Sequence, residues 1–166
     1  LEFSCDGEPA PWQVYTRRGK PSVGHLAQQA WQTQLALTAR TVMAKRIDNH
    51  PFGGPLRLEM DFFRSIPETI PEGKRLDWIK EHLIQRPDLR NYGKAAEDAF
   101  KGILWHDDSQ VVSDGDAKGF SLDRPFTLIR LYRLDLEPPG LASSSILTTT
   151  RRGFALEISA PAPKLI

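Results

Sequence analysis

The segment PLRLEMDFF, residues 55–63, constrains the fold more than any other part of the chain. Apolar Leu56, Leu58, Met60 and Phe62 alternate with mostly polar residues, which is the period-two pattern of a strand with one buried face. Two prolines and two glycines between residues 48 and 55 separate this strand from the preceding segment. The pattern therefore predicts a strand in a sheet whose apolar face is covered by the rest of the domain.

Helical and strand patterns on both sides of this strand complete the predicted order. Residues 1–7 alternate like a strand, and residues 23–46 lack proline and space their apolar residues like a long helix that places Trp31 in the core. Residues 91–101 predict a second helix, capped by Asn91 and ended by a glycine. Two further strands are expected at 109–113 and 126–134, separated by a turn-rich segment.

The expected fold class is α+β, with a mixed sheet packed against two main helices in the order strand, helix, strand, helix, strand, strand. A short helix within residues 72–84 is read as part of an insertion. Residues 1–134 are predicted to form one domain. Residues 135–166 are predicted to be a C-terminal tail that is disordered or packed against a partner.

Composition limits the compartment and the chemistry. The chain has 166 residues, of which 40% are apolar, and its 22 basic and 21 acidic side chains give a net charge of +1, so affinity for a polyanion depends on how the charges are distributed. A single cysteine excludes an intrachain disulfide and a cysteine-rich zinc site. No apolar run is long enough for a membrane span, and no secretory signal is visible, so a cytoplasmic protein is expected.

The stretch RPDLRNYGKAAEDAFKGILWHDDSQVV, residues 86–112, carries the densest chemistry. Asp88 precedes the second helix, Lys94 lies in its first turns, and Asp107 and Asp108 follow its end. The helix rises roughly 16 Å, and residues 103–108 span roughly 20 Å if extended, so the acids are able to meet around Mg²⁺. The spacing equally fits a turn before the helix and a polar turn after it.

Basic residues elsewhere predict contacts with phosphate. Arg17, Arg18 and Lys20 surround a tyrosine in a loop, which is the composition of a phosphate-contacting arm and also of a solvated basic loop. Arg86 and Arg90 would extend the same positive track. Such contacts hold the backbone of DNA and do not read its bases.

The stretch 86–112 resembles the RusA family of Holliday junction resolvases, whose signature runs Asp-x-Asp-Asn, x-x-Lys, an alanine-rich helix, and Asp-Asp-x-Gln-Val-Val. The resemblance implies a homodimeric endonuclease of DNA recombination and repair that uses Mg²⁺, with Mn²⁺ as a substitute, to nick four-way DNA junctions. It places the catalytic roles on Asp88, Lys94 and Asp108 and the metal on Asp88, Asp107 and Asp108. The second aspartate of the first motif is replaced by Arg90.

Arg90 leaves more than one function open. In an extended segment it would face the same side as Asp88, and at about 5 Å with an effective dielectric near 20 each charge there is worth roughly 3 kcal/mol. Asp98 or Asp107 can supply the missing ligand, or Arg90 can clamp the scissile phosphate, which is the reading we favour. The alternatives are a catalytically impaired protein that binds branched DNA, and a globular protein unrelated to nucleic acid.

Overall fold

The computed structural model describes residues 1–12, 22–82, 84–134 and 164–165, so the predicted basic arm at Arg17, Arg18 and Lys20 and most of the predicted tail lie outside them. The α+β class, with a mixed sheet, is confirmed. The helices are α1 (Val23–Ala44), α2 (Arg75–His82) and α3 (Leu89–Phe100), with 3-10 turns η1 (Glu72–Lys74) and η2 (Asp108–Gln110). The strands are β1 (Glu2–Asp6), β2 (Leu56–Ser65), β3 (Val111–Ser121), β4 (Phe126–Arg133) and β5 (Lys164–Leu165).

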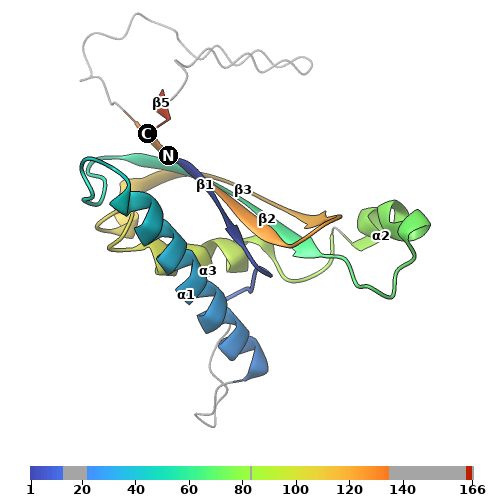
Figure 1. Cartoon of the computed structure of the whole chain (residues 1–166). Helices are drawn as coiled ribbons and strands as arrows, with labels where there is room; N and C mark the ends of the chain where they lie inside the picture. The colour runs from blue at the N-terminus through green and yellow to red at the C-terminus, as the bar shows by residue number, and fades with distance from the viewer. Residues whose placement is uncertain (13–21, 83, 135–163, 166) are drawn as a thin grey trace, which may run out of the picture.

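The sheet follows the order β1-β4-β2-β3, and β5 pairs with the end of β4 (Figure 1). β2 and β3 run parallel, whereas β4 is antiparallel to both β1 and β2. A parallel pair requires a crossover connection, and here the crossover carries α2 and α3. The connection therefore brings α3 back against the strands that it joins. No helix in the described part of the chain has both the length and the apolarity that crossing a membrane requires.

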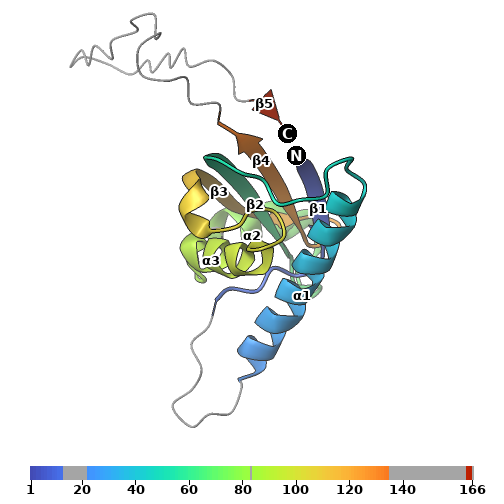
Figure 2. The same ribbon diagram turned by 90° about the vertical axis from the view of Figure 1, so that its left-hand side faces the viewer.

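The core lies between one face of the sheet and helices α1 and α3 (Figure 2). The alternating apolar residues of β2, from Leu56 to Phe62, are fully buried, as the sequence predicts. Trp31 of α1 is only 3% exposed, which confirms its predicted place in the core. The ring of Phe62 stacks on Tyr92 of α3 with centroids 5.4 Å apart, so aromatic packing fixes α3 on the sheet.

The segment predicted to be rich in turns, residues 114–125, is instead largely strand, because β3 continues to Ser121. Ten residues of β2 pair with β3, and this ladder overrides the local turn signal. Gly115 pairs with Glu59 and Gly119 with Phe63, and a Cβ at either glycine would come within 3.2 Å of the facing side chain. These glycines therefore permit close packing between strands.

Candidate functional site

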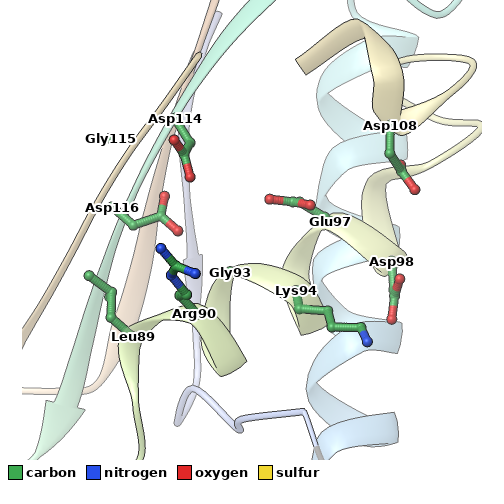
Figure 3. A pocket seen from close by; sticks show the side chains of 10 residues that line it. All are labelled: Leu89, Arg90, Gly93, Lys94, Glu97, Asp98, Asp108, Asp114, Gly115 and Asp116. Atoms are coloured by element: carbon green, nitrogen blue, oxygen red, sulfur yellow. The ribbon is translucent and has the colours of Figure 1, made fainter. Parts of the chain in front are cut away.

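An open cleft of about 830 Å³ separates α3 from β3 (Figure 3). Its walls combine five carboxylates with two basic side chains and no aromatic residue. The lining residues are Leu89, Arg90, Gly93, Lys94, Glu97, Asp98, Asp108, Asp114, Gly115 and Asp116. Seven of these ten fall in the stretch 86–112 that the sequence singles out, and the other three come from β3.

Helix α3 divides its residues between the core and the cleft. Tyr92, Ala95, Ala96, Ala99 and Phe100 are buried against the sheet and α1. Their helical spacing leaves the adjacent face, from residue 90 to residue 98, to line the cleft. An alanine-rich buried stripe brings the helix close to the sheet, so that its charged face lies near β3.

Strand β3 supplies two carboxylates that the sequence reading missed. Asp114 pairs with Leu58 and Asp116 with Met60, so both acids lie on the face of the sheet that α3 covers. Gly93 of α3 approaches β3 closely, since a Cβ there would lie 2.6 Å from Asp116 Oδ2. Asp114 and Asp116 are two residues apart, which fits one face of a strand. The glycine between them, however, favours a turn when the sequence is considered locally.

Asp116 is held in an unfavourable environment for a charge. Its Oδ1 is buried and has no hydrogen-bond partner among the residues that the structure describes. Burial, followed by the negative charges of Asp114 and Glu97, raises the pKa of Asp116 to about 7, although a hydrogen bond from the Met60 amide lowers it. Burial and then the charges of Asp108, Asp114 and Asp98 also raise the pKa of Glu97. The cleft thus concentrates negative charge that only a cation offsets well.

Asp107 and Asp108 meet at the C-terminal end of α3 around Lys101. Asp108 Oδ2 lies 3.0 Å and Asp107 Oδ2 lies 3.4 Å from Lys101 Nζ. Asp108 Oδ1 also accepts a hydrogen bond of 3.1 Å from Trp105 Nε1, which orients the carboxylate at the cleft wall. Asp107 caps η2 by accepting from the Ser109 amide, and this bond, with Lys101, lowers the pKa of Asp107 to about 2.

Asp88 lies at the opposite end of α3, where it is the exposed N-cap residue. Lys101 follows Asp88 by 13 positions, which correspond to roughly 20 Å along a helix axis. The structure therefore does not bring Asp88 together with Asp107 and Asp108, and Asp88 is not part of the cleft wall. The N-cap of the helix lies three residues before the predicted one, at Asp88, so Asn91 lies inside the helix and is not its cap.

This earlier start changes the reading of Arg90. Because Arg90 is helical, the period-two argument that placed it on the same side as Asp88 is wrong, and Arg90 lines the cleft while Asp88 does not. Figure 3 shows the Arg90 guanidinium pointing toward the carboxylate of Asp116. Arg90 lies on the exposed first turn of α3, from which its guanidinium can face a ligand in the cleft.

Lys94 is exposed on the cleft rim, and its Nζ lies 3.9 Å from the ring centroid of Trp12. Such a cation–π contact orients the ammonium without neutralising it. Trp12 is itself tied to α3, because its amide donates to the Asn91 carbonyl over 2.7 Å. Arg86 is exposed just before α3 and does not line the cleft.

The chain matches the family model of endodeoxyribonuclease RusA over residues 6–132 and therefore belongs to the RusA family, as the sequence resemblance predicts. It is also similar to the uncharacterized protein YqaN of Bacillus subtilis (strain 168), with 27% identity over 129 residues that cover 73% of this chain and 88% of that protein. RusA nucleases act on branched DNA and generally depend on a divalent metal. Membership favours a function on nucleic acid over the alternative of a globular protein unrelated to nucleic acid.

Proposed function

We propose that the protein is an endodeoxyribonuclease that hydrolyses phosphodiester bonds of four-way DNA junctions with a divalent metal, in DNA recombination and repair. The observation that carries this proposal is the open cleft between α3 and β3, where carboxylates meet two basic side chains within the segment that matches the family. A homodimer, in which two such clefts nick two strands symmetrically, completes the proposal.

The donor set of the cleft fits Mg²⁺ or Mn²⁺. Carboxylate oxygens are the hard ligands that these ions prefer, and the buried Oδ1 of Asp116 has no hydrogen-bond partner within the described part of the chain. No three His, Cys, Asp or Glu side chains among the described residues already form a metal-holding group. Mg²⁺ does not require one, since it is commonly held by one or two carboxylates together with substrate phosphates and water. Bound there, the ion would polarise the phosphodiester and lower the pKa of a water.

The residues of the chain have separate roles in this scheme. Asp108, oriented by Trp105, presents its carboxylate from one end of the cleft. Lys94, steadied on Trp12, keeps an exposed positive charge that can stabilise charge developing on the phosphate. Arg90 offers a planar guanidinium fork that suits bidentate contact with phosphate oxygens. Asp88 and Asp107 remain predicted catalytic and metal-binding residues, and Arg17, Arg18, Lys20 and Arg86 remain predicted DNA contacts.

The decisive test incubates the full chain with a synthetic four-way junction and Mg²⁺. We expect paired nicks in the presence of Mg²⁺ or Mn²⁺, none in EDTA, and strongly reduced nicking by Asp88→Asn and Asp108→Asn. A duplex of the same sequence is the control for structure selectivity. Absence of nicks from the parent chain in either metal, with junction binding intact, would reject the nuclease and leave a binding protein.

A protein that binds branched DNA without cutting it is the second candidate function. The contacts of Lys101 with Asp107 and Asp108 favour it, because these acids already have an internal cation. Arg90 favours it as well, because a positive side chain lies where the family has an aspartate. This candidate predicts junction affinity that is independent of divalent ions and that decreases steeply with salt.

Arg90→Ala should weaken junction binding under either candidate. If Arg90 contacts one phosphate, the slope of log affinity against log salt should fall by about 1. Fluorescence anisotropy with a labelled junction between 50 and 200 mM salt in EDTA measures this slope. The matched control is Lys80→Ala, which removes an exposed cation from α2, away from the cleft. An unchanged slope for Arg90→Ala would show that Arg90 does not contact the DNA.

A further inference from the structure

We propose that Lys118 of β3 is a positioning residue for Asp88, because its ammonium group holds the chain segment that leads into α3. Lys118 Nζ donates hydrogen bonds of 2.7 Å to the Gln85 carbonyl and 3.0 Å to the Pro87 carbonyl. Asp88 is the next residue along the chain. The inference rests on the proposed function, in which Asp88 is a catalytic residue, and it adds a residue that lies outside the cleft wall.

The backbone around Asp88 determines where its carboxylate lies. Asp88 is exposed, and its side chain makes no capping hydrogen bond to the first turn of α3, all of which the structure describes. A carboxylate that is neither buried nor used as a cap remains available to a ligand. On the C-terminal side the helix holds the backbone, since the Asn91 amide donates to the Asp88 carbonyl over 3.0 Å. The N-terminal side requires a separate anchor.

Lys118 is that anchor because it belongs to the sheet. It pairs with Phe62 of β2, whose side chain is buried beneath the helices, so Lys118 projects from the same face of the sheet as α3. An ammonium group has three donors, and hydrogen bonds from a charged donor are roughly twice as strong as those between neutral groups. Two such bonds, to alternate residues, attach the connection between α2 and α3 to β3.

The surroundings of Lys118 differ from those of a surface ion pair. Its side chain is half-buried and lines a small pocket together with Pro87, Tyr92 and Arg64, and no acid among the described residues lines this pocket. Carbonyl oxygens, and not a carboxylate, therefore hold the ammonium group there. Its positive charge would also suit direct contact with a DNA phosphate, and the experiment separates these two roles.

Hydrogen–deuterium exchange of the full chain tests the anchor without DNA or metal. Lys118→Met keeps an apolar stem and removes both hydrogen bonds, so peptides covering residues 84–92 should exchange at least fivefold faster, while peptides from α1 keep the parental rate. Lys118→Arg restores the charge and the donors and should slow the exchange again. Lys80→Met is the control, because Lys80 is an exposed lysine of α2 that pairs with Asp77. If Lys118→Met does not fold by circular dichroism, Lys118→Gln takes its place.

Single-turnover cleavage of a four-way junction at saturating protein tests the positioning role. Lys118→Met should lower the cleavage rate at least tenfold and raise the Mg²⁺ concentration for half-maximal rate, because Asp88 is displaced. Its junction affinity in EDTA and the salt dependence of that affinity should stay within twofold of the parental values. Lys118→Arg should recover most of the rate. A general loss of stability would not separate rate from affinity in this way.

Each departure from these results has a distinct meaning. Parental exchange of residues 84–92 in Lys118→Met would overturn the anchor, and faster exchange with parental cleavage would overturn the positioning role and keep the nuclease. Weaker junction binding with a salt slope lowered by about 1 would assign Lys118 to direct phosphate contact instead. No cleavage by the parent would reject the nuclease, and the exchange rates would then decide alone whether Lys118 anchors the segment before Asp88.

Discussion

Phe62→Ala is expected to lower the free energy of unfolding by about 3–5 kcal/mol, the usual cost of truncating a fully buried aromatic residue. Phe62 is 0% exposed, stacks on Tyr92 with centroids 5.4 Å apart, and meets Trp31 edge-on at 6.0 Å. It therefore joins β2 to both helices of the core. Chemical denaturation followed by far-UV circular dichroism measures the loss.

Phe63→Ala is the matched control for this variant, since it removes the same side chain one residue later on the opposite face of the sheet. Phe63 is half-buried and stacks on Phe126 with centroids 4.5 Å apart, so a loss of about 1–2 kcal/mol is expected. Equal losses from the two variants would contradict the assignment of the core to the helical face. The difference matters for function because Phe62 holds the helix that forms one cleft wall.

Asp116→Asn is expected to stabilise the protein in the absence of metal, by an amount that depends on pH. The folded pKa of about 7 lies above the ordinary value of 3.8, so the fold favours the neutral carboxyl and loses stability as the unfolded chain ionises. The variant and the parent should therefore be equally stable below pH 3.8. The advantage of the variant should grow between pH 4 and 7 and remain level above pH 7.

Above pH 7 the variant should be more stable than the parent by about 2 kcal/mol. The full pKa shift of Asp116 corresponds to roughly 4 kcal/mol, and partial exposure of the side chain to solvent reduces this free energy. Urea denaturation in EDTA at pH 4, 5.5, 7 and 8.5 measures the profile. The matched control is Asp123→Asn, which removes an exposed acid outside the cleft wall. A constant difference between parent and Asp116→Asn across this range would show that the carboxyl ionises normally in the fold.

The elements that the sequence predicts well are those whose own pattern is strong. The alternation of β2 and the helical spacing around Trp31 describe how each segment buries one face, and burial bears both out. The motif from residue 86 to residue 112 also identifies the family and most of the cleft wall on α3. These features are local, so they can be read from neighbouring residues alone.

The predictions that were wrong concern segments whose conformation is decided by contacts with residues distant in the sequence. Residues 114–121 form a strand because ten residues of β2 pair with β3, and Gly115 and Gly119 face large side chains on β2. The start of α3 at Leu89 turns Arg90 into the cleft and leaves Asp88 at the far end from Asp108. The local preference of a few residues for a turn or a helix cap is weak compared with the stabilisation from a complete β-ladder or a packed helix face.

The sequence by itself determined the α+β class, the family and the acidic segment around α3, because each is encoded in a short run of residues. Only the tertiary structure decided which carboxylates line the same cleft. The parallel pairing of β2 with β3 determines which face of the sheet Asp114 and Asp116 lie on, and the close approach at Gly93 brings Asp116 near α3. Both depend on strand register and helix packing between segments that the chain sequence separates.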